Sequence, residues 1–112
     1  MDTRQQRVAK NEALFREVNE RIKDVNFSHV GTGEHDFLCE CGDDDCTAPI
    51  SLTLAEYEHV RADSTHFAIV PGHDVPDVES VISQNERFAV VEKETPAAAR
   101  IAVERDPRDG ER

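Results

Sequence analysis

The first 26 residues carry a helical pattern of apolar and polar positions. Residues 3–26 contain neither Gly nor Pro, and apolar side chains recur at intervals of seven, three, four and three: Val8, Phe15, Val18, Ile22 and Val25. This spacing is typical of an amphipathic helix with one apolar side. The stripe predicts packing within the same domain or, as an alternative, a seam between two copies of the helix.

The middle of the chain predicts two short elements on either side of a cysteine loop. Residues 27–36 contain two glycines and read as a loop, and residues 37–41, FLCEC, read as a short strand. Alternation along a strand would point Cys39 and Cys41 to the same side. Thr53 and Glu56 have the spacing of a capping box, which predicts a helix over residues 53–62.

The last third of the chain predicts a small antiparallel sheet. Residues 66–70, HFAIV, read as a strand that ends in a Pro-Gly turn, and residues 78–84 and 87–93 read as a hairpin. An alanine-rich stretch follows, and the charged residues 105–112 read as a disordered tail. We therefore expect one α+β domain over residues 1–104, with a long N-terminal helix, a cysteine loop, a short capped helix and a sheet of about three strands.

Composition limits the classes of partner. The 112 residues carry a net charge of −11, with 38% hydrophobic and 33% charged residues, so the chain can build only a modest core. Such a surface repels phosphate backbones and anionic membranes, which disfavours direct nucleic-acid or membrane binding. A basic protein partner fits the charge, and so does solubility alone. No apolar run follows Met1, so we expect neither a signal peptide nor a membrane span.

All three cysteines of the chain lie within eight residues, with the spacing C-x-C-x4-C, and three consecutive aspartates precede the last of them. An odd cysteine count without an export signal predicts a reducing, cytoplasmic setting, where clustered cysteines are more often metal ligands than structural disulfides. Zinc prefers four thiolate and imidazole ligands in a tetrahedron. Cys39, Cys41 and Cys46 would supply three of them.

The fourth ligand has five candidates, which are His29, His35, His59, His66 and His73. His73 ranks first because the Pro-Gly turn before it would hold the ring rigidly. His35 ranks second because it lies close to the cysteines in sequence. The resulting hypothesis is a structural zinc site in a protein-interaction or regulatory module.

Other functions of the same residues stay open. The cysteines could form a redox sensor that releases zinc on oxidation, or they could be unligated. A small metalloenzyme would keep one coordination position for water and use Glu40 as a base. The stretch from His35 to Cys46 contains no Lys or Arg, and its acidic residues predict a surface that binds a basic protein. These residues are Asp36, Glu40, Asp43, Asp44 and Asp45.

The segments NEALFREVNERI, FLCECGDDDCTAPISLTLAEYEHVRAD, HFAIVPGH and RFAVVEK resemble a group of small, mostly actinobacterial proteins of unassigned function. The resemblance covers about residues 8–108. Its C-x-C-x4-C and P-G-H elements match Cys39, Cys41, Cys46 and His73 of this chain. It implies a common module and no particular reaction.

Overall fold

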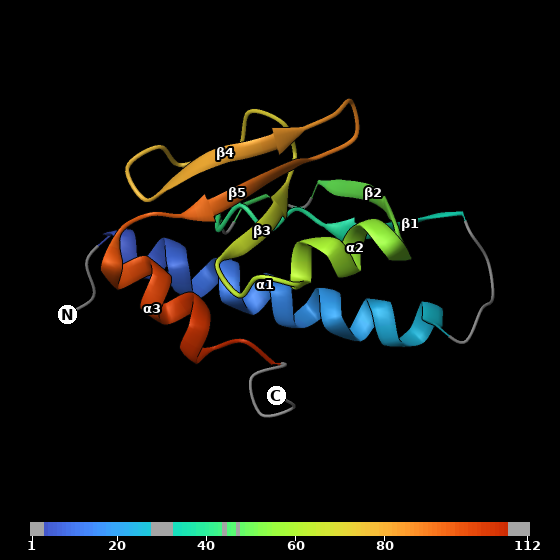
Figure 1. Cartoon of the computed structure of the whole chain (residues 1–112), viewed down its shortest axis with the longest axis horizontal. Coiled ribbons are helices and arrows are strands. Elements are labelled where there is room, and N and C mark those ends of the chain that lie inside the picture. Colours follow the sequence, from blue (N-terminus) through green and yellow to red (C-terminus); the bar gives the residue numbers. More distant parts are fainter. Residues whose placement is uncertain (1–3, 28–32, 44, 47, 108–112) are drawn as a thin grey trace.

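The computed structural model describes residues 4–27, 33–43, 45–46 and 48–107. These residues form an α+β fold with three helices and two small antiparallel sheets (Figure 1). The elements follow the order α1 (Arg4–Phe27), β1 (Glu34–Leu38), β2 (Pro49–Thr53), α2 (Leu54–Arg61), β3 (His66–Ile69), β4 (Glu79–Gln84), β5 (Ala89–Lys93) and α3 (Pro96–Glu104). The predicted fold class is confirmed.

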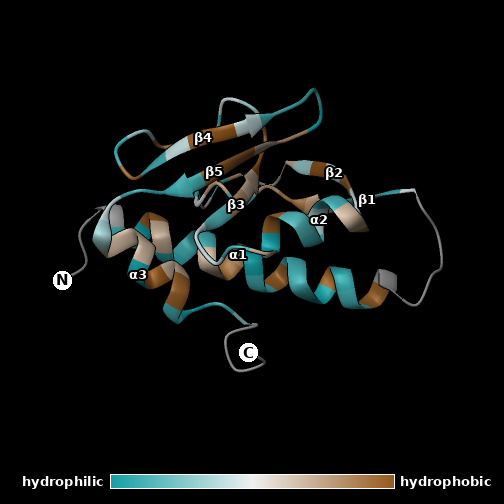
Figure 2. Cartoon of the chain, in the orientation of Figure 1, coloured by the Kyte–Doolittle hydropathy of each residue, from teal (hydrophilic) through white to brown (hydrophobic). Residues whose placement is uncertain are grey.

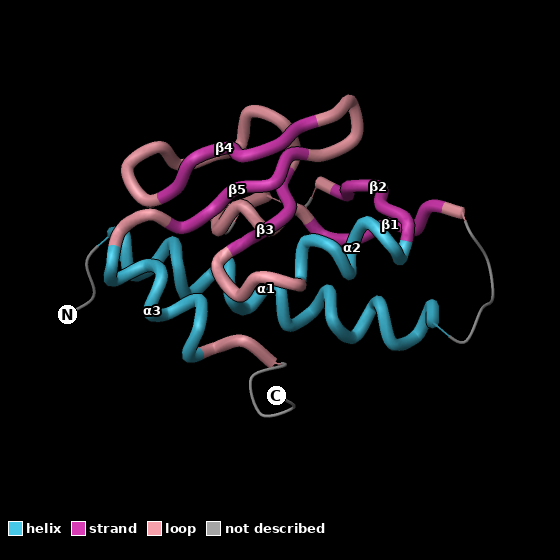
Figure 3. Tube along the Cα trace, viewed as in Figure 1, coloured by secondary structure: helices cyan, strands magenta, loops and turns pink. Residues whose placement is uncertain are grey.

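The larger sheet has the strand order β3-β5-β4, and β1 pairs with β2 in the smaller one. The helix α1 runs beneath both sheets and contacts β1, α3 lies beside its N-terminal half, and α2 packs against β2 and β3 (Figures 1 and 3). The core fills the space between these layers with aromatic and aliphatic side chains. Its largest members include Phe37 and Tyr57, whose rings stack with centroids 4.6 Å apart, and Phe67, which is fully buried.

Local sequence signals locate several elements correctly. Thr53 and Glu56 form both hydrogen bonds of the capping box, and α2 begins at Leu54. The predicted hairpin corresponds to β4 and β5, although its turn extends to Phe88, whose backbone oxygen accepts from the Asn85 backbone N–H at 2.9 Å. The alanine-rich stretch forms the helix α3.

The prediction of a strand over residues 37–41 is wrong in position. The strand β1 spans Glu34–Leu38 and therefore takes up part of the predicted loop, while Cys39 and Cys41 come after its end. The partner strand β2 sets this register by placing Ile50 opposite Phe37. Pairing with a strand whose residues lie 11 to 19 positions further along the chain is not encoded in the alternation of five residues.

The helix α1 has the predicted extent, but its buried side differs from the predicted apolar stripe. Val25 is 66% exposed, and Leu14 beside the stripe is 54% exposed. Figure 2 shows that hydrophilic and hydrophobic residues alternate along α1 rather than separating cleanly. The buried side consists of small and polar residues instead: Ala9, Glu12, Ala13, Arg16, Asn19 and Glu20.

These polar residues are buried because each meets a partner on another element. Glu12 and Glu79 both pair with the Lys93 ammonium, which is fully buried. The Arg16 guanidinium donates to the backbone oxygens of Ser64 and Ala102, both at 2.6 Å. Buried charges are tolerated only when they are paired or hydrogen-bonded, so α1 docks through specific polar contacts.

The folded part of the chain continues beyond the expected domain boundary at residue 104. Asp106 is 5% exposed and pairs with the buried Arg61, which also contacts Glu20 at 3.2 Å. The helix α3 and the residues after it are thereby tied to α1 and α2. Residues 108–112 of the predicted disordered tail lie outside the described residues.

Candidate metal centre

The three cysteines and His73 come together at one point of the fold. One ligand atom from each of Cys39, Cys41, Cys46 and His73 lies within 4.8 Å of all the others. Cys39 and Cys41 are buried, Cys46 is half-buried, and His73 is exposed. His35 lies in β1 outside this cluster, and His29 falls outside the described residues. Among the histidines that the structure describes, His73 is the one that the fold brings to the cysteines.

The backbone around Cys39 fixes the first half of the cluster. Cys39 donates its N–H to Ala48 O at 3.1 Å, and Glu40 donates its N–H to Ala68 O at 2.9 Å. These bonds attach the segment after β1 both to the approach to β2 and to β3. The Val70 N–H donates to Cys39 Sγ at 3.2 Å, so the end of β3 already satisfies this sulfur.

Two glycines supply backbone conformations that place the remaining ligands. Gly42 has φ +81° and Gly72 has φ +93°, in the left-handed region that favours glycine. Gly42 follows Cys41 and turns the chain toward Cys46, whose N–H donates to Asp43 O at 3.0 Å. Gly72 precedes His73, whose N–H donates to Val70 O at 3.0 Å. The rigid Pro-Gly turn expected before His73 is present.

The imidazole of His73 faces two sulfurs through one nitrogen. Its Nδ1 lies 3.6 Å from Cys39 Sγ and 3.7 Å from Cys46 Sγ. With Zn–S bonds of about 2.3 Å and Zn–N bonds of about 2.0–2.1 Å at tetrahedral angles, a sulfur and a nitrogen on one ion lie about 3.6 Å apart. The two separations therefore match those around a tetrahedral ion.

The thiols share their protons unequally. The hydrogen bond from Cys39 lowers the pKa of Cys41 to about 5. The same bond, together with burial, raises the pKa of Cys39 well above that of an ordinary thiol. The hydrogen bond between the two thiols therefore favours a thiolate at Cys41 over one at Cys39.

Glu40, which lies between the two buried cysteines, is not a candidate base for metal-bound water. Its side chain is fully buried, and it accepts from Asn19 Nδ2 at 2.7 Å and from the Ala68 N–H at 3.0 Å. Burial raises the pKa of this carboxyl group. Its position indicates a role in attaching the cysteine segment, the stretch between β1 and β2 that holds the three cysteines, to α1 and β3. No sequence motif predicts this role.

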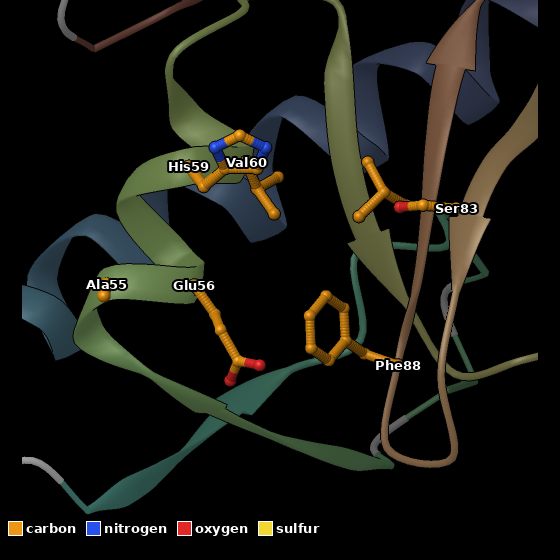
Figure 4. Close-up of a pocket in the computed structure, with 7 residues that line it drawn as sticks. Ala55, Glu56, His59, Val60, Ser83 and Phe88 are labelled. Carbon is orange, nitrogen blue, oxygen red and sulfur yellow. The ribbon is translucent and has the colours of Figure 1, made fainter.

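A hollow of about 250 Å³ opens beside the cluster and is lined by Cys41, Asp43, His73 and Val75. Solvent therefore reaches the exposed side of the site. A second hollow, of about 280 Å³, lies between α2 and the larger sheet (Figure 4). Its lining is mostly apolar, and its carboxylate, Glu56, is already paired with Arg87 at 2.6 Å.

No protein-family model matches the chain, and no curated protein or solved structure does either. The resemblance to small actinobacterial proteins therefore stays a prediction. Among the described residues, no helix combines the length and the apolar character that crossing a bilayer requires.

Proposed function

We propose that Cys39, Cys41, Cys46 and His73 bind one Zn²⁺ ion and that this ion stabilises the fold of a small regulatory or interaction module. The observation that supports the proposal most directly is the pair of S···N separations of 3.6 and 3.7 Å at His73 Nδ1. Four ligands of the thiolate and imidazole type are those of structural zinc sites. A reducing compartment such as the cytoplasm would keep the thiols available.

The ion would act by joining two segments that are far apart in the sequence. Cys39, Cys41 and Cys46 lie between β1 and β2, whereas His73 follows β3. In a small domain the free energy of metal binding adds to the free energy of folding, because the unfolded chain does not present the four ligands together. We therefore expect zinc to hold the cysteine segment onto the end of β3.

Elemental analysis of purified protein should find one zinc per chain, and Cys46→Ser should abolish tight binding. His73→Asn should weaken binding in the same assay. His59→Asn is the matched control, because His59 is an exposed histidine of α2 outside the cluster. Retention of one tightly bound zinc by Cys46→Ser would show that the ligand assignment is wrong.

The structural role has a test of its own. A strong chelator should lower the melting temperature of the wild-type protein and increase amide exchange in residues 37–50, and added zinc should reverse both effects. Cys46→Ser protein should not respond to either addition. A melting curve that stays the same after the metal has been removed would contradict a structural role while leaving the site itself intact.

A redox sensor is the second candidate function, and the half-buried Cys46 beside the hollow favours it. Hydrogen peroxide would convert the Cys46 thiolate to a sulfenic acid and release hydroxide. Attack by the Cys41 or Cys39 thiolate would then form a disulfide, release a second hydroxide and eject the zinc ion. Zinc release that follows peroxide stoichiometrically and is reversed by dithiothreitol would favour this function, whereas zinc retained in peroxide would exclude it.

We also propose that the acidic surface near the cluster binds a basic protein and does not bind nucleic acid. Asp36, Asp43 and Asp45 are exposed, which supports the charge argument, whereas Glu40 is buried and drops out of it. Association with such a partner should slow as salt rises, since the Debye length is about 8 Å at physiological ionic strength.

Replacement of Asp43, Asp44 and Asp45 by Asn should weaken the interaction at constant zinc content. If pull-down with wild-type and variant protein recovers the same partners in equal yield, this surface is not the interface. Binding of a nucleic-acid duplex at physiological salt, seen as a gel-mobility shift, would also contradict the proposal. The chain is expected to be a monomer or a dimer that pairs through α1, and its mass in analytical ultracentrifugation distinguishes the two.

A further inference from the structure

A second group of metal-binding side chains lies at the opposite end of β3 from the cysteine cluster. Asp63 follows α2, His66 begins β3, and Glu92 lies on β5. One ligand atom of each lies within 4.8 Å of the others. We propose that these three residues form a solvent-accessible site for a divalent first-row metal ion, distinct from the thiolate site and independent of it.

The separations within the group fit three ligands on one ion after small adjustments. His66 Nε2 lies 2.8 Å from Glu92 Oε2 and 3.6 Å from Asp63 Oδ2. Imidazole and carboxylate ligands bind at about 2.0–2.2 Å, so two of them on one ion lie about 3.0–3.5 Å apart at angles of 90–110°. The two observed values bracket that range. Displacement of one carboxylate by a few tenths of an ångström would make room for the ion.

The fold holds each ligand in place before any ion arrives. His66 and Glu92 are directly opposite each other in the antiparallel pairing of β3 with β5, so their side chains lie on the same face of the sheet. Asp63 Oδ1 accepts from the Thr65 N–H at 2.9 Å and from Thr65 Oγ1 at 2.8 Å. Because one carboxylate oxygen is fixed by the turn, the other is oriented toward His66 Nε2. Such preorganisation lowers the cost of assembling the site.

Exposure leaves room for water molecules to complete the coordination. The side chains of Asp63 and Glu92 are 52% and 43% exposed, while that of His66 is 19% exposed. Two carboxylates and one imidazole suit Mn²⁺ as well as Zn²⁺, whereas thiolate ligands select softer ions and do not suit Mn²⁺. The chemistry of the two sites therefore differs enough for one probe to distinguish them. Mn²⁺ should report on the Asp63–His66–Glu92 site even when zinc fills the cysteine cluster.

The test is a titration of the full-length, zinc-supplemented protein with MnCl₂ at physiological salt. Electron paramagnetic resonance measures the free aqua ion, and paramagnetic broadening of backbone amides locates the bound ion. We expect one Mn²⁺ per chain, with the strongest broadening at residues 63–66 and 92. A second-layer partner typically changes metal affinity about 10- to 100-fold, so loss of a direct ligand by His66→Ala or Glu92→Gln should weaken binding at least about tenfold.

His59→Ala is the matched control and should bind Mn²⁺ like the wild type, because His59 lies on α2 outside the group. Glu92→Gln keeps the size of the side chain and an oxygen that can accept a hydrogen bond from His66. It therefore tests the site even if His66→Ala misfolds. Unchanged affinity in both His66→Ala and Glu92→Gln would overturn the proposal, as would broadening spread evenly over the acidic surface. Either result would mean that His66 and its two carboxylates contact one another without binding a metal ion. Neither result bears on zinc at the cysteines.

Discussion

Replacement of each of the two left-handed glycines by alanine measures how closely the cysteine segment approaches α1. A Cβ atom added to Gly42 would lie 2.8 Å from Glu12 Cγ and 2.8 Å from Val8 O, distances that real Cβ atoms do not tolerate. A Cβ atom on Gly72 would meet no atom within 4 Å. Both residues have a positive φ and both adjoin a candidate ligand, Cys41 or His73. Both substitutions therefore strain the backbone, but only Gly42→Ala also brings the new Cβ atom into collision with α1.

The expected magnitudes follow from these distances. A non-glycine residue in the left-handed region costs about 1–2 kcal/mol, which both variants should lose. Forcing an extra carbon into a packed contact costs about 1–3 kcal/mol more, and only Gly42→Ala should lose that amount. The collision involves the backbone of α1 and the buried Glu12, which is held by Lys93, so neither neighbour can simply move away. We expect Gly42→Ala to lose about 2–5 kcal/mol of unfolding free energy.

Urea unfolding followed by circular dichroism measures both losses of unfolding free energy. Equal m-values would indicate that the two variants expose the same amount of surface on unfolding. The measurements are made with zinc and with chelator, because the ion could hide part of the loss. Equal losses for the two variants would refute the inferred close approach between Gly42 and α1. A larger loss for Gly72→Ala would refute it more strongly.

Two ion pairs outside the candidate metal centre give further predictions. The hydrogen bond from Arg87 lowers the pKa of Glu56 from 4.5 to about 2, so its contribution to stability is complete above pH 4.5 and is lost as the pH falls toward 2. Glu56→Gln should therefore cost about 1 kcal/mol at neutral pH, and the difference from wild type should disappear in acid; a constant difference would contradict this. Asp106→Ala should cost about 3–5 kcal/mol in urea unfolding because it leaves the buried Arg61 guanidinium short of a partner. Replacement of the exposed Glu104 by Ala should cost far less. Similar losses for both would show that the C-terminal pair is unimportant.

The features predicted correctly from the sequence are those specified within a few residues. The capping box at Thr53 needs only Glu56, and the turn before His73 needs only Pro71 and Gly72. The grouping of three cysteines with one histidine was accessible for a related reason. Three of the four lie within eight residues, so only one had to be chosen by argument. A rigid turn was a sufficient reason to choose His73 over His35.

The strand over residues 37–41 shows where local reasoning fails. An alternation of five residues fits a strand that begins at Glu34 as well as one that begins at Phe37. The choice depends on β2, which begins at Pro49, a residue type that is rare inside strands. Strand register is decided by the partner, and the partner's own signal was hidden by its proline.

The apolar stripe of α1 fails for a different physical reason. The residues on each side of the helix recur with the helical period. Hydropathy favours burial of the side with Val18 and Val25 over the side with Glu12 and Arg16. Hydropathy ranks each residue as if it were buried alone. The cost of burying Glu12 or Arg16 depends on a lysine about eighty residues away and on two backbone oxygens of distant segments. No window of sequence contains those partners.

This polar docking also connects α1 with the cluster of Cys39, Cys41, Cys46 and His73. Asn11 Nδ2 donates to Gly42 O at 3.1 Å, and Asn19 Nδ2 donates to Leu38 O at 2.9 Å while its Oδ1 accepts the Leu38 N–H at 2.8 Å. An apolar stripe tolerates sliding by a fraction of a turn, but these bonds have fixed directions and lengths. The helix therefore holds the chain on both sides of the stretch from Cys39 to Cys41. If an ion orders this segment, the same bonds extend the ordering to α1, and loss of the ion should loosen the helix as well as the loop.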